Sequence, residues 1–504
     1  MGFKTALKLS VIIVSACGNQ GGTDGTSGGA PSQVGGSANA GGSATSGGSS
    51  AGEQPEGDAG AARGGASGSS AGGTTAQSGA ASGGNGGLAS LLADPCRGAM
   101  LTGTSYVPDG MCARVVATGL RKVRQLSFSS DGALWATSSD GAISRLLDTD
   151  GDGQFRASEI TDWASTGGNG QNLHIDEAGG FLYAGTPSGV KRWPWSKTLA
   201  AGGPGEDVVI GQPSEGGHSK HTVKLWDGWL YVMSGSSDNV VDPDSPAYDT
   251  KRSQIKRFKL SELKGNSPFD WLSDGEVFAN GLRNTLGFNQ DAMGRIYGVQ
   301  NGQDQVEYGG ADVHQDNPGE VIVRLDAGTS HGYPFCFVAQ SLDGVEPGMQ
   351  VSSAIFPNNP HDDTWCQNSA NALPPVTFVQ AHTAPMDIVF YTGPFGALPD
   401  TWKNGAFVSL HGSWNRTTAT GYKVVWVPFN ADGSAPLPTN SGGTTNFTFE
   451  VVFGKTADKV ANSSEEWTDG GQVRPVGIAV SPMDGALYIS SDENGRIYRV
   501  GLQR

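Results

Sequence analysis

The sequence has no hydrophobic run of the roughly 20 residues that a membrane-spanning helix requires. It is also poor in positive charge, because 33 basic residues stand against 49 acidic residues and the formal net charge is −16. Binding to phosphate backbones needs a basic surface, so we expect no nucleic-acid partner. No segment keeps apolar residues at positions i, i+3, i+4 and i+7 over three turns, which argues against a helical fold.

The beginning of the chain is typical of a bacterial lipoprotein signal. A short apolar stretch, residues 9–16, follows Lys4 and Lys8 and ends directly before Cys17. We expect residues 1–17 to be this signal, with a lipid on Cys17 as the only attachment to a membrane. The rest of the chain would then lie in the cell envelope, on its periplasmic or extracellular face. The alternative is an ordinary signal peptide with an incidental cysteine.

Aromatic residues are missing from the next segment, and charged residues are rare in it. From residue 18 to about residue 90 the chain is almost wholly Gly, Ser, Ala, Thr and Gln. Such a composition cannot bury enough apolar surface to offset the entropy lost on ordering. We expect a flexible linker over residues 18–90, with a reach on the order of 45 Å, and a folded domain over residues 91–504.

Cysteine is scarce as well, with four residues after Cys17. None shows the spacing of a zinc site, and a translocated domain lies in an oxidising compartment, so we expect disulfides. Closeness in sequence favours two pairs, although four cysteines allow three connectivities. The favoured pairs are Cys96 with Cys112 and Cys336 with Cys366.

The folded domain is rich in short runs of Val, Ile, Leu, Tyr and Trp between Gly, Asp and Asn, which are typical of strands. A turn–strand phrase, DGALWA at residues 131–136, returns in related form at 180–184 and 227–232 and is nearly copied at 484–489. Each copy leads into a second turn and a second strand. A sheet of this kind leaves both faces apolar, so the repeats must stack, and radial stacking gives a β-propeller.

Two further strand pairs bring the count to six blades, so the sequence predicts an all-β fold, a six-bladed β-propeller. These pairs are residues 294–300 with 319–326 and residues 406–411 with 421–429. The strand at residues 112–120 precedes the first full repeat, and we expect it to complete the last blade and close the ring. The competing interpretation, a β-sandwich plus a second domain, fits the repeats poorly.

Residues 148–159 match the twelve-residue calcium loop, with carboxylates at positions 1, 3, 5 and 12 and glycine at position 6. The flanking segments are not amphipathic helices, so we expect a structural calcium in a loop that bridges two propeller blades. The alternative is an acidic turn without metal, and neither interpretation implies catalysis. The expected ligands are Asp148, Asp150, Asp152, Gln154 and Glu159.

The eight histidines all lie in the propeller region, several of them in loops beside Gly, Ala or Pro. A propeller would direct most of these loops at its central axis. A cluster of His, Arg and Asn at the mouth of the axial channel is therefore the predicted site. The loops concerned lie around residues 217–222, 280–284, 300–304, 381–385, 410–416 and 473–477.

These loops resemble the glucose/sorbosone dehydrogenase family, which includes soluble quinoprotein glucose dehydrogenases and sorbosone dehydrogenases. The resemblance covers about residues 112–501, and its most specific pieces are GLRN at 281–284, HGSWNR at 411–416, RPVG at 474–477 and the phrase around His218. The family fold is a six-bladed propeller. The resemblance implies oxidation of a sugar or sugar aldehyde, with hydride passing to pyrroloquinoline quinone held by calcium.

The resemblance also implies roles for individual residues. His218 matches the general base, which takes a hydroxyl proton as hydride leaves the same carbon. Arg283 and Asn284 match the pair that contacts the quinone, where a cation stabilises developing negative charge. Gly302 and Gln303 match the two residues whose main-chain carbonyls hold the site calcium, so glutamine in place of the usual proline is tolerable.

Departures from the family pattern affect the cofactor carboxylates. Arg474 matches one of the arginines that bind them, and His411 is counted with it as a cofactor contact. His411, however, stands where the quinoprotein branch has a lysine, and Val476 stands where it has a second arginine. Pyrroloquinoline quinone carries three carboxylates, so losing two cations should weaken its binding. No motif indicates the electron acceptor.

Plainer interpretations apply to several residues. Loop histidines such as His221, His331 and His382 are expected to be structural or peripheral, and tryptophans such as Trp193 and Trp414 to pack between blades rather than to bind sugar. The alternative function is a non-catalytic propeller that binds carbohydrate or protein at the cell surface.

Overall fold

The computed structural model describes Cys96, Leu101 and residues 103–241, 251–265, 267–356, 358–441, 444–460 and 465–503, and their fold is all-β. The expected signal with Cys17 and the expected linker over residues 18–90 lie outside these residues. None of the described helices is both long and apolar enough to span a bilayer. They are α2 (Asp363–Cys366) and the 3-10 turns η1 (Ala157–Glu159), η3 (Leu260–Glu262), η4 (His314–Asp316) and η5 (Asp400–Trp402).

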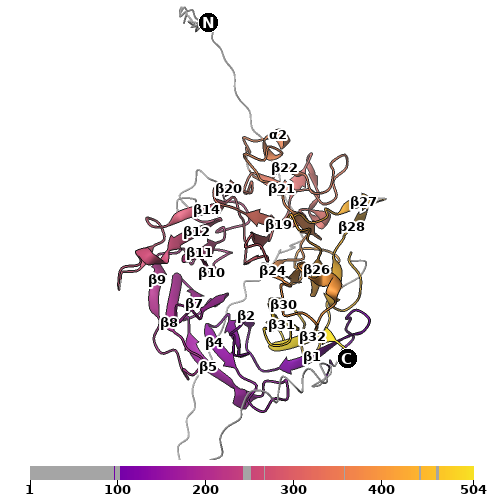
Figure 1. Ribbon diagram of the computed structural model, residues 1–504. Coiled ribbons are helices and arrows are strands. Elements are labelled where there is room, and N and C mark those ends of the chain that lie inside the picture. Colours follow the sequence, from indigo (N-terminus) through magenta and orange to yellow (C-terminus); the bar gives the residue numbers. More distant parts are fainter. Residues whose placement is uncertain are drawn as a thin grey trace, which may run out of the picture. The chain divides into compact units, whose positions relative to one another are not determined.

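Six sheets of four or five strands stand around a central axis, and the innermost strands of the six sheets follow one another in chain order (Figure 1). Blade 1 consists of β2 (Val123–Phe128), β3 (Leu134–Ser138), β4 (Ala142–Leu146) and β5 (Ile160–Ser165). Blade 2 consists of β6 (Leu173–Asp176), β7 (Phe181–Thr186), β8 (Gly189–Pro194), β9 (Glu206–Ile210) and β13 (Phe269–Asp270). Blade 3 consists of β10 (Val223–Trp226), β11 (Trp229–Ser234), β12 (Gln254–Lys259), β14 (Glu276–Asn280) and β20 (Thr329–Ser330).

The second half of the domain supplies the other three blades. Blade 4 consists of β15 (Gly287–Gln290), β16 (Ile296–Gln300), β19 (Glu320–Leu325) and β23 (Thr377–Val379). Blade 5 consists of β24 (Pro385–Phe390), β25 (Ala406–Leu410), β26 (Lys423–Val427) and β29 (Glu450–Phe453). Blade 6 consists of β30 (Pro475–Val480), β31 (Leu487–Ser491), β32 (Arg496–Leu502) and β1 (Met111–Ala117).

The ring is closed by strands from the two ends of the domain. β1 pairs antiparallel with β32, in a register that runs from Met111 opposite Leu502 to Ala117 opposite Ile497. This confirms the predicted closing strand and the predicted count of six blades. Figure 1 shows the two strands side by side, β1 in indigo and β32 in yellow.

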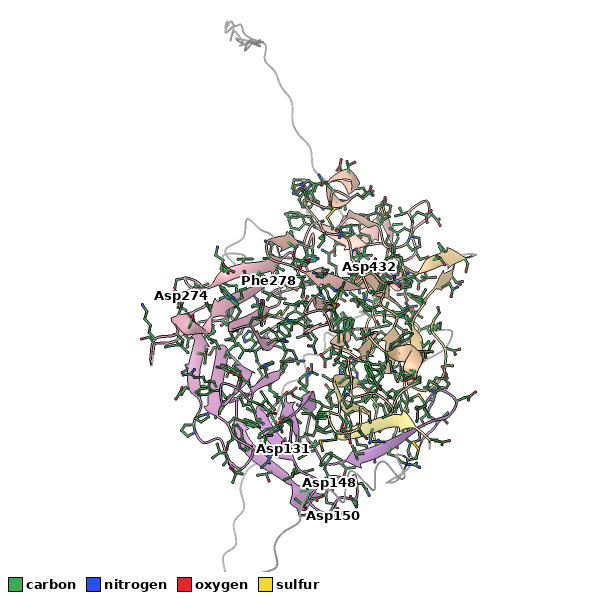
Figure 2. All side chains as sticks on the ribbon, in the orientation of Figure 1. Asp131, Asp148, Asp150, Asp274, Phe278 and Asp432 are labelled. Atoms are coloured by element: carbon green, nitrogen blue, oxygen red, sulfur yellow. A yellow bond between two sulfur atoms is a disulfide. The ribbon has the colours of Figure 1, made fainter. Side chains whose placement is uncertain are left out.

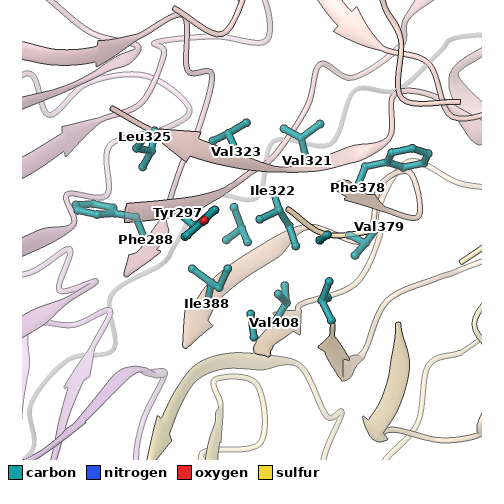
Figure 3. Close-up of a cluster of buried hydrophobic side chains, with 14 of the residues drawn as sticks. Phe288, Tyr297, Val321, Ile322, Val323, Leu325, Phe378, Val379, Ile388 and Val408 are labelled. Carbon is teal, nitrogen blue, oxygen red and sulfur yellow. The ribbon is translucent and has the colours of Figure 1, made fainter. Parts of the chain in front are cut away.

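The strands are buried because each blade packs both of its faces against its neighbours. Every residue of β3, β16, β25, β26 and β31 is buried, and these strands are mostly Val, Leu, Ile, Ala and aromatic residues. The largest apolar cluster joins blades 3, 4 and 5 and includes Tyr231, Phe288, Tyr297 and Ile388 (Figure 3). Trp193 is fully buried in another cluster, between blades 1 and 2, as expected.

Blade 4 carries long insertions outside the propeller sheets. They contain two small hairpins, β17 (Glu307–Tyr308) with β18 (Ala311–Asp312) and β21 (Cys336–Val338) with β22 (Gln350–Ser352), and also α2. A further hairpin, β27 (Thr439–Ser441) with β28 (Thr444–Asn446), extends blade 5. The disulfides are Cys336–Cys366, which joins β21 to α2, and Cys96–Cys112, so both predicted pairs are present.

Candidate active site

The candidate site lies at one end of the propeller, where two sets of loops meet. One set precedes the first strand of each blade, and the other joins the second strand to the third. Because neighbouring strands in these parts of the blades are antiparallel, both sets lie at the same end of the sheets. The residues that the sequence predicted all come from these loops: His218, Arg283, Asn284, Gly302, Gln303, His411 and Arg474.

His218 precedes β10 and presents one ring nitrogen as a proton acceptor. Its Nδ1 lies 3.0 Å from the carbonyl oxygen of Ser236 and 2.8 Å from the Ser236 hydroxyl. Because a carbonyl oxygen only accepts, Nδ1 carries the proton and Nε2 keeps a lone pair. Burial, together with the charge of Arg283, lowers the pKa of His218 to about 3. The imidazole is therefore neutral near pH 7, as a general base must be.

Arg252 and Gly235, which no sequence motif indicated, shape the surroundings of His218. The Arg252 guanidinium donates to the carbonyl oxygens of Gly235 at 2.7 Å, His218 at 3.0 Å and Ser236 at 3.2 Å. An added Cβ at Gly235 would lie 2.6 Å from the His218 Cβ and 3.1 Å from the Asn284 Oδ1 atom. His218 and Asn284 therefore adjoin across a position that only glycine can occupy. No motif marks Arg252, because its partners are main-chain atoms distant in sequence.

Arg283 and Asn284 precede β15 and are both buried. Arg283 pairs with the Asp304 carboxylate at 2.7 Å, and Asn284 Nδ2 donates to Asn301 Oδ1 at 3.0 Å. The Oδ1 atom of Asn284 is buried and receives no hydrogen bond from any described residue. An unpaired buried acceptor is costly, so this atom is suited to meet a ligand.

The turn at Gly302 and Gln303 is held in place by hydrogen bonds between its N–H and side-chain groups and buried residues. The Gly302 N–H donates to the buried Glu320 carboxylate at 2.7 Å. The Gln303 side chain donates to the Pro334 carbonyl oxygen and accepts from the Ser353 hydroxyl, each at 2.6 Å. No described residue donates a hydrogen bond to the main-chain carbonyl oxygens of Gly302 and Gln303. Both carbonyls can therefore act as ligands for a hard cation.

The same end of the propeller, called the mouth below, holds two cations that no motif indicated. Arg124, in β2, pairs with Asp492 at 2.6 Å, and His411 Nε2 lies 2.9 Å from the other oxygen of that carboxylate. Burial opposes ionisation of Asp492, but the hydrogen bond from His411 and the charge of Arg124 hold its pKa well below the usual range. Burial and the charge of Arg124 lower the pKa of Lys220 to about 8. Arg124 and Lys220 thus lie around the carboxylate that His411 contacts, and Lys220 supplies the net positive charge of this group.

Arg474 and the loop after β25 complete the mouth. The Arg474 guanidinium donates to the Gly412 carbonyl oxygen at 3.1 Å. Asn415, in the same loop, donates to the Asp304 carboxylate at 3.3 Å, and Asp304 in turn holds Arg283. The predicted residues therefore belong to one chain of contacts that runs through blades 4, 5 and 6 and adjoins His218 of blade 3.

Three other loop histidines lie as expected for structural residues. Both ring nitrogens of His221 are within hydrogen-bonding distance of main-chain carbonyl oxygens. His382 Nε2 donates to the Asn317 carbonyl oxygen at 2.9 Å. His331 is buried and lines a small cavity together with Arg283, Gly302 and Gln303. Its Nδ1 atom is buried and has no hydrogen-bond partner among the described residues, so His331 is the one of the three with a buried, unpartnered ring nitrogen.

The predicted calcium loop joins β4 to β5 within blade 1. It also contacts β1 of blade 6, because the Phe155 N–H donates to the Val116 carbonyl oxygen at 2.7 Å, so the loop bridges two blades as expected. Figure 2 shows Asp148 and Asp150 at the outer edge of the propeller.

The carboxylates of this loop gather around one point. Oxygen atoms of Asp148, Asp150 and Asp152 lie within 4.8 Å of one another. Arg156 pairs with the last two, and the Gln154 N–H donates to Asp152 at 2.9 Å. Burial raises the pKa of Asp148, and so do the charges of Asp152 and the Glu159 carboxylate. Glu159 itself accepts from main-chain and hydroxyl donors of the loop.

Trp414 does not pack between blades, in contrast to the expectation from the sequence. Trp414 lies in the loop after β25, and 74% of its surface is exposed, whereas Trp193 has no exposed surface. Hydrophobicity alone did not indicate which aromatic residues lie in loops without a covering neighbour.

Comparisons with known proteins agree on one family. Residues 105–503 match the TrAA12-like family. A pyrroloquinoline quinone-dependent pyranose dehydrogenase from Coprinopsis cinerea is 31% identical over 287 residues, which are 53% of this chain but only 37% of that protein. A pyrroloquinoline quinone-dependent sugar dehydrogenase from Hypocrea jecorina is 28% identical over 416 residues, which are 77% of this chain and 87% of that protein.

Solved structures confirm the propeller fold. The calcium structure of a carbohydrate-active enzyme of family AA12 from Trichoderma reesei has a TM-score of 0.68 at 26% identity, and the match covers 80% of this chain and 98% of that one. The holo form of the quinone domain of the Coprinopsis cinerea pyranose dehydrogenase has a TM-score of 0.67 at 24% identity, with 80% and 98% covered.

The hydrogen bonds of His218 predict a single tautomer. Nitrogen-15 NMR of histidine-labelled protein should show its Nδ1 protonated and its Nε2 unprotonated from pH 8 down to about pH 5, because its pKa lies near 3. The spectrum of His218→Ala identifies the signal. A titration of that signal with a midpoint at about 6.5, the value of an unperturbed histidine, would contradict the predicted environment.

Proposed function

Because the chain belongs to the TrAA12-like family, we propose that it oxidises a sugar or sugar aldehyde by hydride transfer to pyrroloquinoline quinone. The curated relatives from Coprinopsis and Hypocrea are named as dehydrogenases that depend on this cofactor. One observation carries the proposal: His218, whose Nε2 is unprotonated, lies across Gly235 from the unpaired Oδ1 atom of Asn284, and the charge of Arg283 helps burial to lower the pKa of His218.

The residues present fit the quinone and its calcium. The carbonyl oxygens of Gly302 and Gln303 are ligands of the kind that calcium prefers, and no described donor occupies them. Asn284, in the adjoining loop, offers a further buried acceptor. Glutamine in place of proline at position 303 is compatible with this role, because its side chain is bonded elsewhere and only its main chain would coordinate.

In the proposed reaction the sugar loses a hydride from one carbon and a proton from the hydroxyl on that carbon. When bound, the quinone supplies an electrophilic carbonyl that takes the hydride. His218 Nε2 takes the proton, and it needs no prior deprotonation because the imidazole is neutral. Arg283, fixed by Asp304, would contact the quinone and stabilise the negative charge that the quinone gains during the transfer.

Arg124, Lys220 and Arg474 bind the cofactor carboxylates in this proposal. Arg124 and Lys220 are supported by their place around Asp492, the carboxylate that His411 contacts. Because Arg124 is already paired with the ionised Asp492, Lys220 supplies one net positive charge in place of the two that are missing at His411 and Val476.

We place the enzyme in the cell envelope, with its lipid on Cys17 and its site facing the periplasm or the exterior. Support comes from the signal-like sequence of residues 1–17 and from the two disulfides, which form in oxidising compartments.

Reconstitution tests the proposed activity. Purified protein given pyrroloquinoline quinone and calcium should bind the quinone in an absorbance titration and reduce a dye in the presence of an aldose. His218→Ala should lower kcat by about 10²- to 10⁴-fold, because the proton acceptor is lost, while quinone affinity stays within a few-fold. His361→Ala, at a partly buried histidine in the insertions of blade 4, is the matched control and should retain wild-type rates.

The outcomes separate the two functional classes. Absence of quinone binding at every calcium concentration would contradict the proposed dehydrogenase activity and favour a non-catalytic propeller. Quinone binding with full activity in His218→Ala would support the dehydrogenase activity but contradict the role of His218 as the general base.

Lys220 gives a separate prediction about cofactor affinity. Lys220→Met should raise the quinone Kd about tenfold at pH 7, because one charge-assisted contact to a carboxylate is lost. Lys220 is protonated below its pKa of about 8, so the difference between variant and wild type should shrink as pH rises through 8. Lys122→Met, at an exposed lysine near Arg124, should leave Kd unchanged. A difference that is independent of pH would exclude the charge as its cause.

We also propose that residues 148–159 hold a structural calcium ion, supported by the gathered carboxylates of Asp148, Asp150 and Asp152. Calcium in excess of its Kd should raise the Tm of the quinone-free protein by about 2–4 °C. Asp148→Asn should abolish most of that increase, whereas Asp162→Asn, at an exposed carboxylate of β5, should retain it. Equal increases in the two variants would show that calcium acts elsewhere.

A further inference from the structure

Trp414 is exposed at the end of the propeller that carries the candidate site. Among the described large hydrophobic residues that are exposed, only Met293 equals its 74%, and Met293 lies in the hairpin turn between β15 and β16, at the opposite end of the propeller. An indole left in water forgoes the free energy that its burial would release. Exposure of this kind suits a residue that awaits a ligand.

Hydrogen bonds fix Ser413, the residue directly before Trp414, to Thr420 and Tyr422 at the other end of the loop. The Ser413 N–H donates to the Thr420 carbonyl oxygen at 2.9 Å, and the Thr420 N–H donates to the Ser413 hydroxyl at 3.0 Å. The Tyr422 hydroxyl donates to the Ser413 carbonyl oxygen at 2.9 Å. The loop is thereby closed upon itself directly beside the indole.

The chain after Trp414 is fixed to blade 4. Asn415 donates to the Asp304 carboxylate at 3.3 Å, and the buried Arg416 side chain pairs with Asp316 at 3.1 Å. With both flanks held, the indole is presented in a set position rather than on a loose loop. Binding against it therefore costs little conformational entropy.

Resting on the proposed function, we propose that Trp414 is the platform on which the pyranose ring of the substrate stacks. Gly412, two residues before it, accepts a hydrogen bond from Arg474, and Asn415, the next residue, contacts the Asp304 that holds Arg283. Trp414 thus stands on the rim of the candidate site. A pyranose has an apolar C–H face that an indole can cover, while its hydroxyl groups stay free for polar partners.

The surroundings of Trp414 favour a sugar over a protein partner. A protein interface requires an apolar patch of several hundred Å², and none of the other exposed large hydrophobic residues belongs to this loop. The residues that follow are Asn415, Arg416, Thr417 and Thr418, whose polar groups suit a hydroxyl-rich ligand. A single aromatic residue among polar ones matches the two-sided chemistry of a sugar ring.

Kinetics and equilibrium binding test this platform in the reconstituted full-length protein. With the most active of D-glucose, D-galactose and D-xylose, Trp414→Ala should raise the sugar KM about tenfold and lower kcat less than twofold, since the lost contact is made equally in ground and transition states. Trp414→Phe should lie between the two. The Kd of 1,5-anhydro-D-glucitol, which lacks the anomeric hydroxyl, should rise in parallel when measured by calorimetry.

Two controls make the result specific. Phe395→Ala removes an exposed aromatic residue in the turn between β24 and β25, at the other end of blade 5, and should leave every constant unchanged. Quinone Kd and dye KM should be unaffected by Trp414→Ala. An unchanged sugar KM and glucitol Kd would overturn the platform, as would an increase confined to the dye KM, which would assign Trp414 to the acceptor.

Failure of the proposed function is distinguishable from failure of the platform. The glucitol titration is repeated on protein without quinone, so it can be read even if the quinone does not bind. Loss of glucitol affinity in Trp414→Ala but not in Phe395→Ala would then support a sugar site without the dehydrogenase. Equal affinity in the three proteins would remove the platform under either function.

Discussion

The antiparallel pairing of β1 with β32 is the constraint on which the site depends. Each blade brings its loops to the mouth only if the blades stand at fixed angles around the axis, and those angles are set when the ring is closed. The closing strand is buried along almost its whole length. Contacts between loops of different blades, such as the hydrogen bond from Asn415 to Asp304, form because the closed ring holds these loops next to each other.

Burial at the mouth disfavours the charged form of every ionisable group, so it lowers the pKa of a histidine and raises the pKa of a carboxyl group. It keeps the imidazole of His218, the proposed base, neutral, whereas Asp492 stays ionised in spite of burial because His411 and Arg124 contact it. The result is a site with one uncharged acceptor among fixed charges. The proposed hydride transfer needs this separation, because the hydride leaves a carbon and the proton leaves the hydroxyl oxygen on that carbon, each toward a different partner.

The repeats of turn and strand predict the blades, because a strand phrase and the stacking that it requires are both local properties. Motif resemblance likewise identifies His218, which lies where expected. Arg252 and Arg124 were missed because their roles arise only from contacts between distant segments, which no spacing encodes. Trp414 was misjudged because hydrophobicity does not indicate whether a loop residue has a neighbour to cover it.

The insertions of blade 4 connect the candidate site to a disulfide. Gln303 is held by the Pro334 carbonyl and the Ser353 hydroxyl, and these groups flank the β21–β22 hairpin that the Cys336–Cys366 disulfide ties to α2. A turn of the candidate site is thus connected, through two hydrogen bonds and one hairpin, to a covalent cross-link in the insertions. Reduction of this disulfide would leave the blades intact and would loosen the support on one side of the candidate site.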